Sequence, residues 1–300
     1  MPDTHVVVAG ASGLIGSALV DGLRADGVRV TTLVRREPHA PGEVQWLADA
    51  APLDPGVLAG ASAVVGLNGA SISRLPWTPG YKSTLLWSRI TPTRTLATAI
   101  RALGSDAPHF VNASATGYYG SAPGERLTES SPRGEGFLAD LCGEWEAAAR
   151  AAGDHARVST LRTAPLIHPR AILKPLLPLT RFGLSGPIGR GTQAWPWISL
   201  EDEVAAIRHV LDHGLHGPVN LAGPTRATAN DLGFALARRL NRPFVLQAPV
   251  PALKLALGRD AAEALLLADA DVAPAALELS GFSFQHRTVE DAVAAAVPAR

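Results

Sequence analysis

Short apolar runs alternate with stretches of helically spaced apolar residues over the first three quarters of the chain. The apolar runs lie at 6–9, 28–34, 63–67, 110–114, 158–163 and 219–222. Helical spacing lies at 14–23, 93–103, 137–152 and about 202–213. Strands that alternate with helices in this way build a parallel sheet covered on both faces. The pattern therefore predicts an α/β fold of the Rossmann type, a doubly wound parallel sheet.

The first apolar run ends in a glycine-rich turn that leads directly into a helical stretch. In that context Gly10 permits a tight turn, Gly13 lets the backbone approach a pyrophosphate, and Gly16 lets the helix close on the strand. The free N–H groups of the helix would receive the phosphates. The alternative is a glycine loop that only packs the helix. The residues expected to contact a dinucleotide are Gly10, Ser12, Gly13, Leu14, Ile15 and Gly16.

Two arginines follow the second apolar run, where an acidic residue would bind the adenosine ribose of NAD. Arg35 and Arg36 stand there instead, and Glu37 comes only after them. A guanidinium binds phosphate oxygens through two parallel hydrogen bonds, which suits the 2′-phosphate of NADP. The sequence therefore favours NADP(H), with Arg35 as the first candidate and Arg36 as the second. The alternative is a solvated pair in a loop.

The regular alternation breaks down after residue 168, where prolines and glycines recur. Helical spacing returns at about 230–240 and across 253–267. The division that we expect is an NADP-binding Rossmann domain at 1–168, with 198–222 returning to it, and a smaller substrate-side, C-terminal lobe at 169–197 and 223–300.

Ligands of this fold bind where the carboxyl ends of the parallel strands meet. The residues after the run at 63–67 are small enough for the nicotinamide-side ribose to lie against them: Asn68, Gly69 and Ala70. Ser114 ends the run at 110–114, and its hydroxyl can hydrogen-bond a reacting oxygen beside the nicotinamide. Tyr118 and Tyr119 follow, and either can supply a proton; the alternative is that they only pack the loop.

Composition narrows the class of partner. Lysine and arginine number 27, as do aspartate and glutamate, so nothing favours a nucleic acid or a membrane surface. The single cysteine excludes an intrachain disulfide, and the histidines have no ligand-like spacing, so we expect no metal. No apolar run reaches membrane-spanning length, and no leader-peptide pattern precedes the first strand. We therefore expect a cytoplasmic protein with a small-molecule substrate.

Small motifs spread over the whole chain add to this picture. They are the glycine turn, Trp77 with Lys82 and Ser88-Arg89, Ser114-Ala-Thr-Gly-Tyr-Tyr-Gly120, Phe137-Leu-Ala-Asp-Leu-Cys142 with Trp145-Glu146, Leu161-Arg-Thr163, Gly189-x-Gly-x-Gln193, Trp197-Ile198 with Glu201-Asp202, Gly217-Pro-Val-Asn-Leu221, Arg242-Pro243, Val250-Pro251, Leu257-Gly258 and Gly281-Phe282-x-Phe284. Together they resemble the extended short-chain dehydrogenase/reductases, and more closely their epimerase-like subfamily 39U. The resemblance implies an NADP-binding reductase fold with a small C-terminal domain.

Three positions depart from that pattern. Most short-chain reductases carry Tyr-x-x-x-Lys on the helix at 137–152, where the tyrosine is the acid/base and the lysine lowers its pKa and holds the ribose. Leu138 and Cys142 stand at those positions, and the sequence contains no Tyr-x-x-x-Lys. We expect Cys142 to be a buried helix residue. The other departures are Ala164-Pro165 in place of Gly-Val, and Ser199 in place of His.

The expected function is that of an NADP(H)-dependent, epimerase-like oxidoreductase acting on a small polar substrate. Ser114 would polarise the reacting oxygen, and a tyrosine or water would supply protons. Lys82 and Arg89 lie in a segment expected to cover the cofactor and to contact its phosphate or ribose; a solvated lysine is the alternative for Lys82. The alternative function is a non-catalytic NADP(H)-binding regulator or scaffold that responds to redox state. The oligomeric state stays open, with a homodimer as one alternative.

Overall fold

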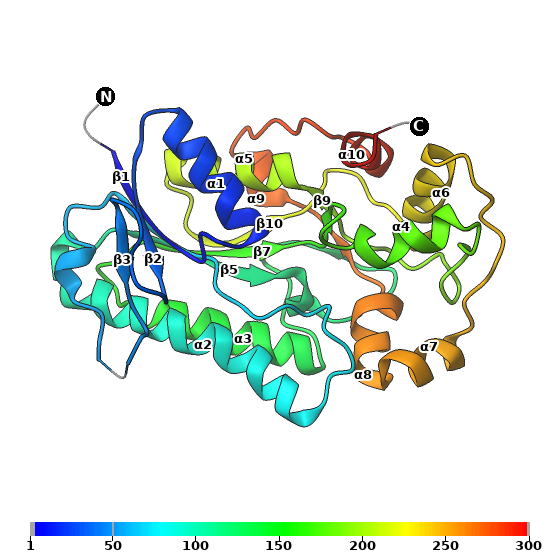
Figure 1. The fold of residues 1–300 in the computed structure, drawn as a ribbon, viewed down its shortest axis with the longest axis horizontal. Coiled ribbons are helices and arrows are strands. Elements are labelled where there is room, and N and C mark those ends of the chain that lie inside the picture. Colours follow the sequence, from blue (N-terminus) through cyan, green and yellow to red (C-terminus); the bar gives the residue numbers. More distant parts are fainter. Residues whose placement is uncertain (1–3, 50, 299–300) are drawn as a thin grey trace.

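The computed structural model describes residues 4–49 and 51–298, and its centre is a seven-stranded sheet (Figure 1). All neighbouring strands are parallel, in the order β10-β7-β5-β4-β1-β2-β3. The strands are β1 (His5–Ala9), β2 (Arg29–Val34), β3 (Glu43–Gln45), β4 (Ala63–Gly66), β5 (His109–Ala115), β7 (Val158–Thr163) and β10 (Gly217–Leu221). The predicted Rossmann-type parallel sheet is confirmed.

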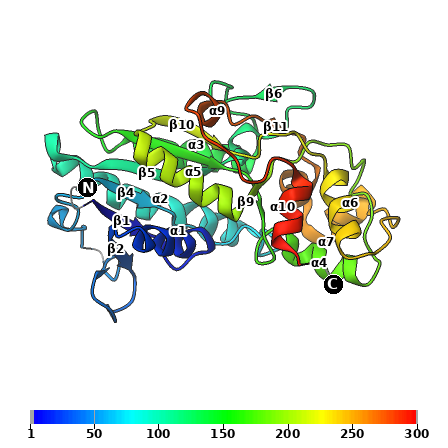
Figure 2. The same ribbon diagram turned by 90° about the horizontal axis from the view of Figure 1, so that it is seen from above.

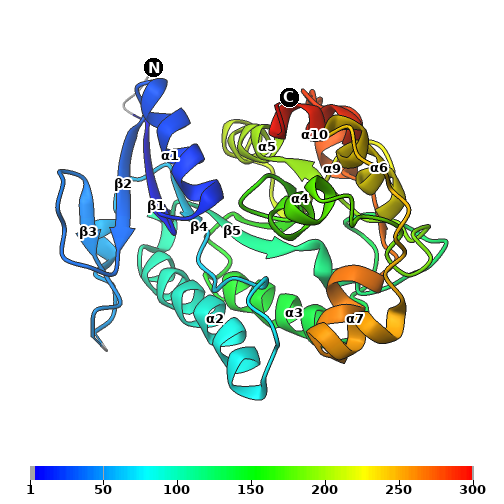
Figure 3. The same ribbon diagram turned by 45° about the vertical axis from the view of Figure 1, so that its right-hand side comes forward.

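Helices cover both faces of the sheet, which explains why the central strands read as unbroken apolar runs. The helices are α1 (Leu14–Ala25) and α5 (Leu200–His213) on one face, and α2 (Pro79–Ala102) and α3 (Phe137–Arg150) on the other (Figure 3). Every residue of β1 is buried. Val6 and Val8 pack in the core that contains α1 and α5, whereas Val7 and Ala9 pack in the core that contains α2 and α3.

Helix α2 is longer than its apolar spacing indicates. The expectation that it starts after Pro92 was wrong: it begins at Pro79, and the Thr78 hydroxyl caps it by accepting a hydrogen bond from the N–H of Tyr81 at 3.2 Å. Pro92 lies buried inside the helix. A proline there removes one helical hydrogen bond, and packing of α2 against α3 and the sheet compensates for that loss.

A smaller lobe lies beyond the carboxyl ends of the strands (Figure 2). Its helices are α4 (Leu173–Arg181), α6 (Ala229–Arg239), α7 (Val250–Leu257), α8 (Arg259–Ala262) and α10 (Val289–Ala296). Helix α9 (Ala275–Leu279) instead packs against β10, in the core that contains α5. Two small sheets pair β6 (Arg126–Leu127) with β11 (Asp271–Val272), and β8 (Leu166–Ile167) with β9 (Ile198–Ser199). Trp195, Trp197 and Leu236 belong to its core. Helix α4 forms although Pro178 lies inside it, where the sequence indicated a break.

The strand order reverses between β1 and β4, because β2 and β3 continue from β1 on one side and β5, β7 and β10 from β4 on the other. In doubly wound sheets this reversal opens a crevice at the carboxyl edge. The turn after β1 and the loop after β4 both lie at that point.

Candidate functional site

The turn after β1 requires glycine at two positions. Gly10 has φ +84°, and a Cβ there would lie 2.7 Å from the carbonyl carbon and oxygen of Leu67. A Cβ on Gly16 would lie 2.3 Å from the carbonyl oxygen of Gly10. The turn is therefore in contact with the chain leaving β4, and α1 packs directly on the turn.

The first turn of α1 is open to an anion. The helix begins at Leu14, no side chain caps it, and its first turn contains no acidic residue. Gly13, its N-cap residue, is exposed, as is Ser12, while Leu14 and Ile15 are half-buried. The first N–H groups of a helix have no intrahelical acceptor and carry its positive dipole end. A pyrophosphate fits this helix end.

The loop after β4 contains a buried side-chain oxygen that receives no hydrogen bond from the described residues. Oδ1 of Asn68 is buried and accepts no hydrogen bond from the part of the chain that the structure describes. Helix α2 holds the rest of the loop: the N–H of Ala70 donates to Oγ of Ser88 at 2.9 Å, and Nη2 of Arg89 donates to the Ala70 carbonyl at 3.1 Å. Because a buried acceptor without a partner is costly, Asn68 suits a ligand that brings a hydroxyl or amide donor.

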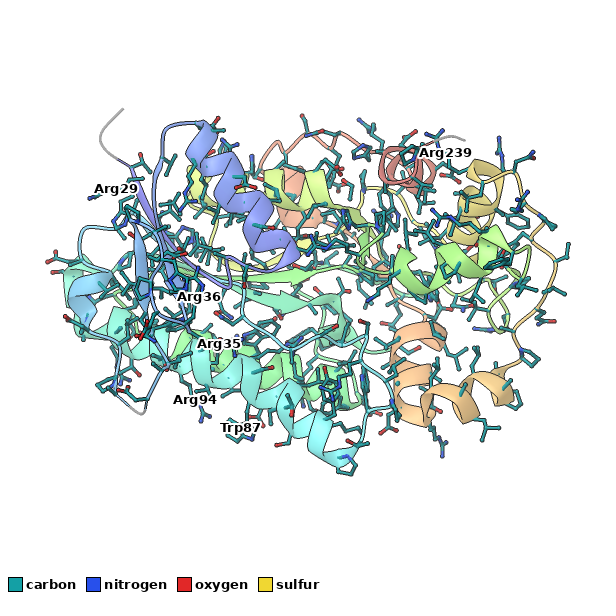
Figure 4. The ribbon with its side chains drawn as sticks, viewed as in Figure 1. Arg29, Arg35, Arg36, Trp87, Arg94 and Arg239 are labelled. Carbon is teal, nitrogen blue, oxygen red and sulfur yellow. The ribbon has the colours of Figure 1, made fainter. Side chains whose placement is uncertain are left out.

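The two arginines after β2 have different surroundings (Figure 4). Arg36 forms two hydrogen bonds with Glu43, at 2.8 and 2.6 Å, and this guanidinium helps to lower the pKa of Glu43 to about 2. Arg35 is exposed, and no hydrogen bond or ion pair joins its side chain to the described residues. Arg35 is thus the guanidinium that remains available to a phosphate.

Ser114 belongs to a buried ionic network. Strands β5 and β7 pair with Ser114 opposite Arg162. The Ser114 hydroxyl donates a 2.8 Å hydrogen bond to Oε1 of Glu146 on α3, and that carboxylate accepts from Nε and Nη2 of Arg162 at 2.8 and 3.1 Å. Burial opposes the charge on Arg162 more strongly than any single contact favours it, but the hydrogen bonds and charges of Glu146 and Tyr119 together outweigh burial and raise the pKa of the guanidinium. The ion pair therefore fixes the direction of the Ser114 hydroxyl.

The two tyrosines of η3 (Thr116–Tyr119) differ in whether the hydroxyl has a hydrogen-bond partner within the described chain. The Tyr119 hydroxyl is buried, donates to Oδ1 of Asn220 at 2.6 Å and accepts from Nη1 of Arg162 at 2.9 Å. Burial raises its pKa, so Tyr119 is a structural link rather than a proton donor to a ligand. Tyr118 is half-buried, its ring centroid lies 3.5 Å from Cζ of Arg162, and its hydroxyl has no hydrogen bond within the described chain.

Leu138 and Cys142 occupy one face of α3, against the loop that follows β5. A Cβ on Gly117 would lie 3.2 Å from Cβ of Leu138 and 3.9 Å from Sγ of Cys142. Burial raises the pKa of the Cys142 thiol to about 12, so it is neutral at physiological pH. Neither side chain can exchange a proton with a ligand there.

Lys82 is bound by the smaller lobe. Its ammonium pairs with Asp260 on α8 and lies 5.1 Å from the ring centroid of Phe137. The structure thus gives its charge a partner within the protein and lends no support to the expected cofactor contact.

Sequence reasoning assigned no role to Glu146, Arg162 or Asn220, which organise Ser114 and Tyr119. A signal was present for two of them. Arg162 interrupts an apolar strand, and Glu146 lies among alanines and a tryptophan on a helix. A charge in an apolar element is rarely buried unless it is paired, so the two opposite charges were candidates for each other.

Neither a membrane-spanning helix nor a group of metal-binding side chains is found among the described residues. No helix of residues 4–49 and 51–298 is long and apolar enough to cross a membrane. Within the same residues, no group of three or more His, Cys, Asp or Glu side chains could hold a metal ion.

An uncapped helix after a glycine turn, at the point where strand order reverses, is typical of dinucleotide-binding α/β proteins. Residues 6–222 match the family model described as NAD dependent epimerase/dehydratase family. Residues 248–296 match a model described as Domain of unknown function (DUF1731). The chain belongs to the NAD dependent epimerase/dehydratase family, and the resemblance to extended short-chain dehydrogenase/reductases is confirmed.

Individual proteins agree with the family models. The chain is 40% identical to "Epimerase family protein Mb2239" of Mycobacterium bovis, over 98% of this chain and 97% of that protein. It is 33% identical to human "Epimerase family protein SDR39U1", over 87% of this chain and 89% of that protein. The crystal structure of human SDR39U1 (isoform 2) with NADPH superposes with a TM-score of 0.88 at 29% identity, covering 98% of this chain and 99% of that one.

Proposed function

We propose that the protein is an NADP(H)-dependent oxidoreductase of the epimerase-like type that acts on a small polar substrate. The observation that carries the proposal is the exposed, uncapped N-terminus of α1, together with an Arg35 side chain and an Asn68 Oδ1 that have no partner among the described residues. Three separate groups thus suit a pyrophosphate, a 2′-phosphate and a ribose hydroxyl or carboxamide. The human relative SDR39U1, crystallised with NADPH, supports the same cofactor.

We assign the pyrophosphate to the glycine turn, from Gly10 to Gly16, and the 2′-phosphate to Arg35. Arg36 supports this arrangement through Glu43 rather than by contact with phosphate. Asn68, Gly69 and Ala70 form the surface for the nicotinamide-side ribose. NADPH, when bound, supplies a hydride.

The polar groups for a substrate are Ser114 and Tyr118. Because the Ser114 hydroxyl donates to Glu146, its oxygen presents lone pairs, and it would accept a hydrogen bond from a substrate hydroxyl. The sequence left the kind of reacting oxygen open, and the hydrogen bond to Glu146 favours a hydroxyl over a carbonyl. Tyr118, whose hydroxyl has no partner in the described chain, is the proposed proton donor.

The face of α3 favours a second function. Leu138 and a neutral Cys142 lie where a proton donor and a ribose anchor would stand, so an NADP(H)-binding protein without turnover is the alternative. Such a protein would act as a regulator that responds to the NADPH/NADP⁺ ratio. We keep the cytoplasm as the proposed location, and the oligomeric state stays open, with a homodimer as one alternative.

Calorimetry with NADPH and NADH tests the binding, and loss of NADPH absorbance with a panel of small aldehydes, ketones and keto-sugars tests the turnover. Tight NADPH binding with turnover of at least one carbonyl supports the enzyme. Tight binding without turnover across the panel supports the regulator. Failure to bind either nucleotide would contradict both proposals.

A further inference from the structure

Arg89 is a buried cation in the middle of α2. The residue is 9% exposed. Nη1 donates to the carbonyl of Leu85 at 2.9 Å, and Nη2 donates to the carbonyl of Ala70 at 3.1 Å. The guanidinium also lies 5.1 Å from the ring centroid of Trp145 on α3.

No carboxylate of residues 4–49 or 51–298 pairs with this guanidinium. The two carbonyls use only part of the donors that a guanidinium offers, and an indole face carries no net charge. Burial lowers the pKa of Arg89. A charge held in the interior without a counter-charge is costly unless a ligand completes its surroundings.

The position of Arg89 indicates which part of a ligand would complete the surroundings of its guanidinium. A Cβ on Gly69 would lie 3.0 Å from Cζ of Arg89, so the guanidinium reaches the loop after β4 because that residue has no side chain. The same loop carries Asn68, whose Oδ1 lacks a donor, and it follows Leu67, which touches Gly10 of the glycine turn. The guanidinium therefore lies beside the surface that we assigned to the nicotinamide-side ribose.

Cys142 is buried three residues before Trp145 on α3, and so lies one helical turn from the indole that the Arg89 guanidinium faces. Helices α2 and α3 thus bring one cationic and one neutral side chain together beside the loop. A lysine at position 142 would place a second cation against Arg89, which like-charge repulsion opposes. Arg89 on α2 can therefore lie beside a neutral Cys142 on α3 without repulsion, whereas a lysine at position 142 would repel it.

We propose that Arg89 is the cationic anchor for the ribose and phosphate on the nicotinamide side of NADP(H), and that it supplies from α2 the charge that Cys142 leaves absent on α3. The inference rests on the proposed function. It names a binding residue that restores one half of the Tyr-x-x-x-Lys pair, the ribose anchor, and leaves the proton donor to Tyr118.

The test compares whole NADPH with 2′,5′-ADP, a fragment that lacks the nicotinamide half. Arg89→Gln should weaken NADPH about 10- to 100-fold, the scale of one or two charge-assisted hydrogen bonds, and change the affinity of 2′,5′-ADP less than about twofold. Moving the charge to α3 in the double variant Arg89→Gln/Cys142→Lys should recover about tenfold of the lost NADPH affinity. Arg89→Lys keeps the charge and should lose less than Arg89→Gln.

Arg94→Gln is the matched control, because Arg94 lies on the same helix, is exposed and contacts Trp87 instead of the loop (Figure 4). It should bind both ligands as the unchanged protein does. Arg89→Gln that binds NADPH as tightly as the unchanged protein would overturn the inference, and so would equal weakening of both ligands, which marks a loosened fold. If the unchanged protein binds neither ligand, the proposed function itself fails.

Discussion

The chemistry open to each hydroxyl in this site depends on the partner of its proton. The proton of Ser114 is directed at Glu146, and that of Tyr119 at Asn220, whereas Tyr118 has no such partner among the described residues. Three residues with the same functional group therefore have three roles: acceptor, structural link and donor.

Replacing Ser114 by alanine should lower turnover about 100-fold, because one preorganised hydrogen bond at a reacting oxygen is lost. NADPH binding should persist, since Ser114 contacts Glu146 rather than the glycine turn. Cys142→Ala is the control and should leave turnover unchanged, because the thiol is neutral and buried. Steady-state kinetics measure the turnover of both variants. An inactive Cys142→Ala together with an active Ser114→Ala would point to thiol chemistry.

Arg35 and Arg36 offer a matched pair of variants. Arg35→Ala should weaken NADPH by about 1.5–3 kcal/mol and leave NADH nearly unchanged, since only NADPH carries the 2′-phosphate. Arg36→Ala removes a guanidinium already bound to Glu43, and its effect on NADPH should be smaller. Calorimetric titrations with both nucleotides measure the difference. Equal losses in the two variants would contradict the assignment of Arg35.

At the scale of elements, the end of α1 is the part of the fold that the proposed function uses most. Gly13→Val should abolish NADPH binding without unfolding the protein, because the side chain would cover exposed N–H groups. The new Cβ would lie 3.3 Å from the Gly10 carbonyl oxygen, a contact that a small shift relieves. Circular dichroism confirms the fold, and calorimetry measures binding. Retained binding would show that the turn is only structural.

Helix α5 carries a buried acid that makes stability depend on pH. Burial raises the pKa of Glu203 from 4.5 to about 8; Oε1 accepts from Thr163, while Oε2 has no partner in the described chain. Between these two values the unfolded chain is ionised and the folded protein holds the proton. Stability therefore falls as the pH rises from about 4.5 to about 8.

Glu203→Gln removes this dependence, because the amide does not ionise. Relative to the unchanged protein, the variant should gain roughly 2–4 kcal/mol in free energy of unfolding between pH 5 and pH 9. Urea unfolding at the two pH values measures the gain. A parallel pH dependence in both proteins would show that Glu203 is ionised in the fold.

At the scale of the whole molecule, one carboxylate joins the segment that leads into α10 to the start of α5. Asp202 at the start of α5 is buried and accepts hydrogen bonds from the N–H groups of Gln285 and His286 at 2.7 and 3.0 Å. Its Oδ2 also accepts from the Ser199 hydroxyl at 2.8 Å. The segment that leads into α10 is thereby held against α5.

Asp202→Asn should lower the free energy of unfolding by about 1–3 kcal/mol, because both carboxylate oxygens accept hydrogen bonds and an amide N–H₂ leaves a donor unsatisfied. Glu201→Gln, the exposed neighbour, is the control and should change stability little. Urea unfolding compares the two, and equal small effects would show that this junction is not needed for stability.

The local pattern of the chain determined the class of fold and the position of the cofactor turn. Apolar runs separated by helical spacing specify a parallel sheet, and the glycines at 10 and 16 specify the turn, because the positive φ of Gly10 and the approach of Gly16 to the Gly10 carbonyl depend on backbone geometry within a few residues. The local pattern did not predict the first half of helix α2, because tertiary packing outweighs the unfavourable proline at position 92.

Tertiary structure alone decided which polar groups are free to bind a ligand. Glu146 and Arg162 come from separate elements, as do Lys82 and Asp260, and Arg89 meets the loop after β4 from the middle of a helix. Whether a charge is paired depends on residues far away in the chain, so spacing identifies a candidate side chain without revealing its partner. Coulombic and hydrogen-bond energies depend on distance and burial, and only the folded chain sets these.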